Sequence, residues 1–213
     1  MELIFLAGGP GANIRNVVKS WSLRREPEGQ TFNYTELCPI TIGCVIRAVT
    51  GTTMADFAQS ALWQPLGAEA DASWCTDSEG QEYNCVNFAC RLRDWARLGQ
   101  LVAQCGMMDG RRVVSEAWID EITSWGPRDQ QVRYGTAPPP GTGALCDLTD
   151  VGYKCYIWHL KSDGSRPMFN GAHGQRVIID MTTQAVVVQT AVTTETGWLP
   201  ELEAMLDAAG SKA

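Results

Sequence analysis

Apolar residues in the first half of the chain recur at the three- and four-residue spacing of amphipathic helices. The pattern predicts a helix over 39–49, with Pro39 suited to its first position and Gly51 suited to the residue after its last turn. Its apolar positions are Ile42, Val45, Ile46 and Val49. A second helix is predicted to begin at Thr53, whose hydroxyl can cap the first amides, and to stop near Pro65. The side chains expected to face inward along it are Met54, Phe57, Ala58, Ala61 and Leu62.

Two further helices are predicted before residue 125. The first covers 92–104 and ends before Gly106, with its apolar residues on or near one face: Trp95, Leu98, Leu101 and Val102. The second begins at Ser115 and brings together Trp118, Ile119 and Ile122. Because tryptophan buries a large apolar area, we expect these tryptophans to anchor the core.

Beyond residue 150 the pattern changes to short runs that are rich in β-branched and aromatic residues and separated by turns. It predicts strands over 153–160, 167–170, 175–180 and 185–190, followed by an amphipathic helix over 198–209. The glycines and prolines of 1–33 make that segment loop-like, and those of 126–150 predict a long loop.

Helices followed by consecutive strands imply an α+β protein: a helical region, a mainly antiparallel sheet and a C-terminal helix. A chain of 213 residues can bury roughly 70% of its unfolded surface in one core. Since no internal repeat or linker divides the sequence, we expect 1–213 to form a single domain.

The charge of the chain argues against several partners. With a formal net charge of −7 and a pI near 4.8, nucleic acid and anionic membranes are not expected to bind, because both require clustered Lys and Arg. The sequence has no run of 18 apolar residues and no charged leader before an apolar core, so we expect no membrane span and a cytoplasmic location. A signal peptide upstream of a truncated start would change that location.

Eight cysteines raise the question of metals and disulfides. Structural zinc sites pair their ligands two to four residues apart, but the closest pair here, Cys85 and Cys90, fits no such spacing. We therefore expect buried, reduced cysteines, no metal and no cofactor.

Several phrases together resemble the β-lactamase-like (penicillin-recognising) serine hydrolases, in particular the 6-aminohexanoate-dimer hydrolases and related esterases. They span nearly all of 20–195 and follow the family's order: Phe32-Asn33-Tyr34, Thr50-Gly51, Trp63-Gln64-Pro65-Leu66-Gly67, Asp71-Ala72-Ser73-Trp74, Arg93-Asp94, Gly110 to Ser115, Gly152-Tyr153 and Gly171-Ala172-His173-Gly174. The resemblance implies an incomplete β-lactamase/transpeptidase-like fold and hydrolysis of an amide or ester through an acyl-enzyme.

The resemblance also implies roles for individual residues. Tyr34 matches the family's catalytic tyrosine, and the backbone amide of Ala172 matches an oxyanion donor. Gly171, Gly174 and Tyr153 are expected to line the substrate site. His173 is either a lining residue of that site or a hydrogen-bonded residue of a strand edge.

The sequence departs from the family at its reactive centre. The Ser-x-x-Lys pair occurs nowhere, because the residues three positions before the four lysines are Asn16, Val151, Trp158 and Ala209. Glu36 and Cys38 follow Tyr34 where relatives carry small polar residues or Asn, and a carboxylate there favours the neutral phenol. The lysine of the lactamases' Lys-Thr-Gly phrase is also absent near 171. A small-molecule amide or ester is therefore a better candidate substrate than a β-lactam.

Two functions remain open. In the first, the chain is the C-terminal part of a serine hydrolase and is inactive because the segment that carries the nucleophile is missing. In the second, it is a non-catalytic binding or scaffold module that retains the fold. Loss of the opening strands would leave a sheet edge uncovered, so we also expect self-association.

Overall fold

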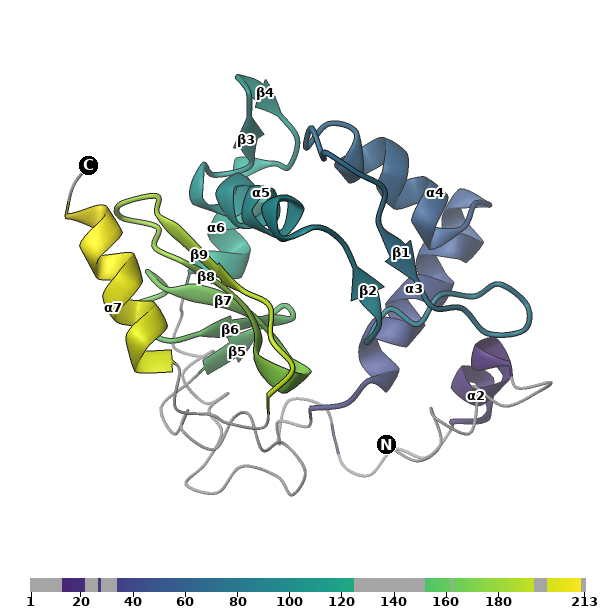
Figure 1. Cartoon of the computed structure of the whole chain (residues 1–213). Coiled ribbons are helices and arrows are strands. Elements are labelled where there is room, and N and C mark those ends of the chain that lie inside the picture. Colours follow the sequence, from purple (N-terminus) through teal and green to yellow (C-terminus); the bar gives the residue numbers. More distant parts are fainter. Residues whose placement is uncertain are drawn as a thin grey trace. The chain divides into compact units, whose positions relative to one another are not determined.

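The computed structural model describes residues 13–21, 27, 34–124, 152–161, 163–193 and 199–211. The chain divides into two compact units, Met1–Arg91 and Leu92–Ala213 (Figure 1). Helices are combined with antiparallel sheets, which confirms the predicted α+β class. That the two units act as one domain stays a prediction.

The first unit consists mainly of helices with one short sheet. Its elements are α2 (Ile14–Ser20), α3 (Leu37–Thr50), α4 (Met54–Ala58), the π-helical η1 (Gln59–Trp63), β1 (Ser73–Trp74) and β2 (Phe88–Ala89). Strands β1 and β2 pair antiparallel.

Helix α2 corrects the prediction that 1–33 is entirely loop-like. The Asn13 side chain caps it by accepting a 3.0 Å hydrogen bond from the amide of Asn16. Ile14 is 2% exposed and packs with Ile40 and Tyr83. The turn signals in the rest of 1–33 lie outside the described residues, apart from Pro27.

Helix α3 confirms the helix predicted over 39–49, and it ends at Gly51 in the left-handed conformation (φ 72°). The face that packs inward contains Ile40 and Gly43. The predicted apolar stripe mostly faces outward instead: Ile42, Val45 and Val49 are 47%, 50% and 80% exposed. The periodicity therefore identified the helix correctly but not its buried side.

The helix that begins after Thr53 has the predicted cap and the predicted end, but not the predicted inward face. Thr53 Oγ1 accepts a 3.0 Å hydrogen bond from the Asp56 amide, and the helix stops at Trp63. Phe57 and Ala61 are exposed, contrary to expectation. Its second half is a π-helix, whose wider turn rotates the apolar face onward. The buried side chains are consequently those of Trp63 and Leu66.

Two buried carboxylates hold helix starts in this unit. Asp77 accepts a 2.8 Å hydrogen bond from the amide of Ile14, at the start of α2. Glu82 accepts a 3.0 Å hydrogen bond from the amide of Ala55, near the start of α4. Since the first amides of a helix have no partner within the helix, the 77–82 segment satisfies two of them and ties both helices to one loop.

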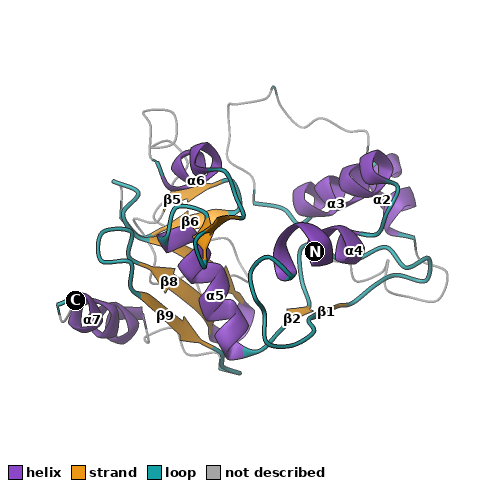
Figure 2. Cartoon of the chain, turned by 90° about the horizontal axis from the view of Figure 1, so that it is seen from above, coloured by secondary structure: helices purple, strands orange, loops and turns teal. Residues whose placement is uncertain are grey.

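The second unit is a five-stranded antiparallel sheet with helices packed against it. Its elements are α5 (Leu92–Ala103), β3 (Met107–Met108), β4 (Arg111–Arg112), α6 (Glu116–Thr123), β5 (Gly152–Lys154), β6 (Ile157–His159), β7 (Pro167–Gly171), the 3₁₀ turn η4 (Ala172–Gly174), β8 (Gln175–Ile179), β9 (Val186–Gln189) and α7 (Leu199–Gly210). The strand order is β5-β6-β7-β8-β9, and α5 and α7 lie on opposite faces of the sheet (Figure 2). These elements confirm the predicted helices and the last three predicted strands. The predicted loop 126–150 lies outside the described residues.

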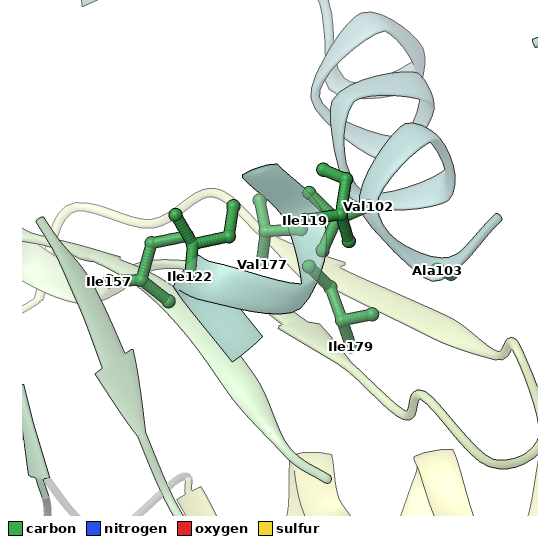
Figure 3. Packing of buried hydrophobic residues seen from close by; sticks show 7 residues of the cluster. All are labelled: Val102, Ala103, Ile119, Ile122, Ile157, Val177 and Ile179. Atoms are coloured by element: carbon green, nitrogen blue, oxygen red, sulfur yellow. The ribbon is translucent and has the colours of Figure 1, made fainter. Parts of the chain in front are cut away.

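The core of this unit lies between the sheet and helices α5 and α6. Figure 3 shows its seven buried members: Val102, Ala103, Ile119, Ile122, Ile157, Val177 and Ile179. Trp95 packs against this cluster, as expected of a core anchor. Trp118 does not, because it is 50% exposed at the surface of α6.

The strand predicted over 153–160 is a hairpin of two strands, β5 and β6. Lys154 pairs with Ile157, so the turn contains only Cys155 and Tyr156. Both residues have positive φ, 48° and 66°, as a type I′ turn requires. Such turns favour Asn and Gly, so Cys-Tyr gives no sequence signal for one. The prediction of one continuous strand was wrong for this reason.

One buried arginine connects the last helix to the sheet. Arg166 is 3% exposed and donates to Asp180 at 2.6 Å and to Asp207 of α7 at 2.9 Å. Glu203 of α7 lies 3.6 Å from the same guanidinium. Burial raises the pKa of Asp180, but amide hydrogen bonds from Thr183 and Thr182 and the Arg166 charge outweigh burial and hold that pKa below its ordinary value.

Two further expectations concern the burial of the cysteines and the absence of a membrane-spanning helix. Of the seven described cysteines, Cys38, Cys75 and Cys155 are exposed and the others are half-buried, so the expectation of buried thiols was wrong. No single helix in the described ranges is long and apolar enough to cross a membrane. The helices Leu37–Thr50 and Met54–Trp63, which are bent by 78° relative to each other, are long and apolar enough only when they are taken together.

Candidate functional site

The predicted glycine-flanked histidine lies in a tight turn between the adjacent strands β7 and β8. Gly171 ends β7, Ala172–Gly174 form the 3₁₀ turn, and Gln175 begins β8. Ala172 and His173 are exposed, whereas Gly174 is buried. His173 adopts φ 60° and ψ 26°, a left-handed conformation that is uncommon outside glycine.

The end of β9 and the segment that follows it hold this turn in place. The amide of Thr193 donates to the His173 carbonyl at 3.2 Å, and the Gln189 side chain donates to the Gly174 carbonyl at 2.9 Å. The Gln175 side-chain amide donates to the carbonyl of Ala191. A side chain at Gly174 would approach Ala191 Cβ to 3.2 Å, so the backbone is close-packed there. These contacts fix the backbone of the turn while the Ala172 and His173 side chains face solvent.

This arrangement suits recognition of a developing negative charge. Oxyanion sites are built from amides whose direction is fixed before the substrate arrives, and a close-packed turn provides such rigidity. Non-glycine residues in left-handed conformations also concentrate at functional sites, because the surrounding structure must maintain the strain. The geometry of the turn is therefore compatible with the roles predicted for Ala172 and His173.

Tyr153, the remaining predicted site residue of this unit, lies away from the Gly171–Gly174 turn. It lies on the edge strand β5 and packs on Trp158 of β6, with ring centroids 4.7 Å apart. By register, Tyr153, Trp158 and Met168 lie opposite one another across three strands and share a sheet face. Gly171 lies three residues beyond Met168 on β7 and thus on the other face. Within this unit the structure does not bring Tyr153 next to the turn.

Tyr34 lies in the other unit, just before α3, and is 44% exposed. Partial burial raises the pKa of its phenol above the ordinary value of 10.0, and the Glu36 carboxylate and the Cys85 thiol raise it further. All three influences favour the neutral phenol, in agreement with the sequence argument about Glu36. The pairing of Tyr34 with the Gly171–Gly174 turn stays a prediction, because the two belong to different units.

The Cys85 thiol, which influences the Tyr34 phenol, is itself held in its protonated form. Burial raises the pKa of Cys85 to about 11, and the Glu36 carboxylate adds to the increase while a backbone hydrogen bond opposes it. Cys85 and Cys44 both pack on the core cluster of Ile14, Ile40 and Tyr83. Across the described ranges no group of three or more His, Cys, Asp or Glu side chains could hold a metal ion.

The hairpin turn Cys155–Tyr156 is a feature that sequence reasoning missed. Because β6 runs antiparallel to β7 and Trp158 pairs with Met168, this turn lies at the same end of the sheet as Gly171. Both of its residues are exposed. That end of the sheet thus presents two exposed segments with positive φ, although neither carries the Asn-Gly or Asp-Gly signature of a tight turn.

The chain's other histidine lies inside the sheet. His159 is 1% exposed and lies in β6, paired with Gly152 of β5 and Pro167 of β7. It therefore packs within the sheet.

Comparison with known proteins agrees with this architecture. No family model matches the chain. Over 170 residues it is 26% identical to the 6-aminohexanoate-dimer hydrolase of Paenarthrobacter ureafaciens, covering 79% of this chain and 41% of that protein. The chain thus spans less than half the length of this curated relative.

Solved structures show the same fold. A Bacillus anthracis structure named for a 6-aminohexanoate-dimer hydrolase superposes with a TM-score of 0.78 at 19% identity, covering 98% of this chain and 53% of the other. A penicillin-binding protein homolog from Caulobacter crescentus superposes with a TM-score of 0.62 at 15% identity, over 98% of this chain and 68% of the other. The predicted β-lactamase/transpeptidase-like fold is confirmed.

Proposed function

We propose that the chain belongs to the β-lactamase-fold serine hydrolases and is the part of an amide or ester hydrolase that binds the acyl group and the oxyanion. The observation that carries the proposal is the rigid, exposed Gly171–Gly174 turn, in a chain related in sequence to a 6-aminohexanoate-dimer hydrolase. In this role the Ala172 amide donates to the oxyanion. His173, Gly171 and Gly174 line the acyl site, and Tyr153 contacts only substrates that extend along the sheet.

Tyr34 acts in this proposal as a proton donor and acceptor for the reacting groups. A phenol titrates near pH 10, so it needs a nearby cation to act as a base at neutral pH. Every influence on the Tyr34 pKa is upward, so in this polypeptide the phenol stays protonated. A lysine supplied together with the nucleophile would oppose that shift.

We further propose that this polypeptide alone turns over no substrate. The full sequence has no Ser-x-x-Lys pair, so no serine stands three residues before a lysine, the spacing that would place both side chains on one helix face. Hydrolases stripped of catalytic side chains retain only about 10³–10⁴-fold acceleration over water, and only when the oxyanion site is whole. Loss of one oxyanion donor costs roughly 3–4 kcal/mol more.

The test is a chromogenic ester assay on two proteins: this chain, and the same chain extended at its amino end by the upstream reading frame. We expect no turnover from the first and serine-dependent turnover from the second, abolished by Tyr34→Phe. Turnover by the unextended chain would contradict the proposed inactivity. An upstream reading frame without Ser-x-x-Lys would favour a non-catalytic binding module.

Binding can be tested without chemistry. The 6-aminohexanoate dimer, as a linear amide probe, is titrated into the chain by calorimetry. We expect His173→Gly to weaken its binding and Gln184→Gly, at a similar φ in a turn distant along the sheet, to leave it unchanged. Equal affinities for both variants would remove His173 from the site.

A further inference from the structure

The turn that carries the Ala172 amide is a short closed loop. Gly171 of β7 pairs with Gln175 of β8, so only Ala172–Gly174 connect the paired strands. Each residue has two soft backbone dihedrals, and in so short a loop these must together bring the strand ends into register. A rotation at one residue of the loop therefore redirects the amides of its neighbours.

The backbone of this loop depends on contacts with the rest of the sheet. His173 has φ 60° and Gly174 has φ 86°, so two consecutive residues have positive φ. For histidine such a conformation persists only where the surrounding structure maintains it. One contact that maintains it is the hydrogen bond from the amide of Thr193 to the His173 carbonyl, at 3.2 Å.

Two glutamine side chains add hydrogen bonds in opposite directions between the turn and the end of β9. Gln189 Nε2 donates to the Gly174 carbonyl at 2.9 Å. In the other direction, the Gln175 side chain donates to the carbonyl of Ala191. The turn and the segment after β9 are therefore held to each other from both sides.

Gln189 is placed to hold the Gly174 carbonyl by its register and by the space around it. It ends β9 opposite Arg176, which is close in sequence to Gly174. A Cβ atom at Gly174 would lie only 3.2 Å from Gln189 Nε2, so the glycine leaves room for the side-chain amide to reach the backbone. Gly174 is buried and Gln189 half-buried, so removing the donor would leave a shielded carbonyl without this partner, which is costly.

We propose that Gln189 is a positioning residue of the oxyanion site. Its side chain holds the Gly174 carbonyl, and the held carbonyl maintains the left-handed conformation of His173. Because the loop is closed, both constraints fix the direction of the Ala172 amide. The inference rests on the proposed function, in which this amide donates to the oxyanion. A donor fixed in advance stabilises a developing charge better than one that must reorient, so Gln189 acts on the reacting group without touching it.

The first experiment measures the turn itself, in the full chain and without a ligand. Gln189→Met keeps the approximate length of the side chain and removes the donor. Gln184→Met, in the exposed turn between β8 and β9, is the matched control. Nuclear magnetic resonance gives the three-bond coupling of the His173 amide, which depends on φ, and the chemical shift of the Ala172 amide. We expect both to change in Gln189→Met and neither to change in Gln184→Met.

Gln189→Glu makes the same contact dependent on pH. A protonated carboxyl group can donate to the Gly174 carbonyl, whereas an ionised carboxylate cannot. At each pH the variant is compared with the natural chain. Its Ala172 and His173 signals should match the natural ones below the pKa of the introduced carboxyl group and depart from them above it. Gln189→Met should differ from the natural chain at every pH.

The second experiment measures binding by calorimetry with two probes. One is the 6-aminohexanoate dimer, and the other is its phosphinate analogue, in which a tetrahedral anionic –PO₂⁻–CH₂– group replaces the amide. We expect Gln189→Met to weaken binding of the phosphinate by about tenfold and binding of the dimer by less, because hydrogen bonds to an ionised acceptor are the stronger ones.

Three results are decisive against these expectations. An unchanged turn in Gln189→Met would overturn the inference, and so would equal changes in affinity for the two probes. A natural chain that binds neither probe would overturn the proposed function, and with it the role of Gln189. Should Gln189→Met fail to fold, as judged by circular dichroism, the comparison of Gln189→Glu at low and neutral pH decides the same question.

Discussion

Replacing His173 by glycine should stabilise the protein while impairing ligand binding. His173 is held at φ 60° and ψ 26°. For an L-residue the left-handed region costs roughly 1–2 kcal/mol, and histidine tolerates it better than most. Glycine removes that cost, but adds about 0.5–1 kcal/mol of backbone entropy lost on folding. The expected net gain is about 0.5–1 kcal/mol, or roughly 1–4 °C in melting temperature for a chain of this length.

Gln184 provides the matched control. It has φ 57°, is exposed and lies in the turn between β8 and β9. Gln184→Gly should give a similar gain, because the same strain is removed in the same unit. Thermal melts followed by circular dichroism, with urea titrations as an independent measure, compare both variants with the natural chain.

A lower stability of His173→Gly together with a higher stability of Gln184→Gly would contradict this prediction. That result would mean that the imidazole contributes more to the fold than the strain costs, and His173 would then be a structural residue. The expected result is an equal gain in stability for both variants, with weaker binding of the amide probe only for His173→Gly. That result would show that the left-handed backbone costs stability and that the imidazole contributes to binding.

Four further predictions concern charge and protonation. Arg166→Met should cost about 3–5 kcal/mol in urea unfolding, because it leaves the buried Asp180 without its partner. The pKa of Asp180 in the folded protein lies below its ordinary value of 3.8, so the ionised Asp180 carboxylate makes its full contribution to stability at any pH above 3.8. That contribution should disappear as the pH falls through the folded value, and Asp180→Asn should lack this part of the acid-induced loss. Glu36→Gln should lower the pKa of Tyr34, measured by ultraviolet titration of tyrosinate; an unchanged pKa would remove Glu36 as a cause. With a pKa of about 11, Cys85 should be the slowest described thiol to react with iodoacetamide at pH 8, which peptide mass spectrometry can rank.

Much of the fold could be predicted because local signals agreed with the tertiary structure. The caps at Thr53 and Ser115 and the left-handed Gly51 mark helix ends that depend on a few neighbouring residues. The strands over 167–190 were found because their β-branched runs are separated by recognisable turns.

The failures share a physical cause: they depend on features that periodicity does not encode. The π-helix at Gln59–Trp63 shifts the buried face by a rotation that an α-helical pattern does not contain. The Cys155–Tyr156 turn adopts positive φ without glycine or asparagine. In α3 the apolar spacing was real, but the side that packs inward is set by contacts with α2 and the 77–84 segment.

The candidate site could be predicted only in part. The glycines around His173 indicated a close backbone approach, and the structure contains a buttressed turn there. That Gln189 and Thr193 hold the turn could not be predicted, because hydrogen bonds between distant segments leave no local pattern. The placement of Tyr153 on the other sheet face follows from the unpredicted hairpin, which fixes the pairing of β5 with β6.

The widened helical turn at Gln59–Trp63 makes the length of this segment a determinant of its packing. A π-turn holds one more residue than the α-turn it replaces, so deleting one residue there could restore regular α-helix without breaking the chain. The remaining residues would then be rotated by roughly 100° about the helix axis. Trp63, whose indole donates to the Ala70 carbonyl at 2.9 Å, would swing out of the interior. Relatives that differ by a single-residue gap at this point should therefore bury a different side chain, even where the flanking sequence is unchanged.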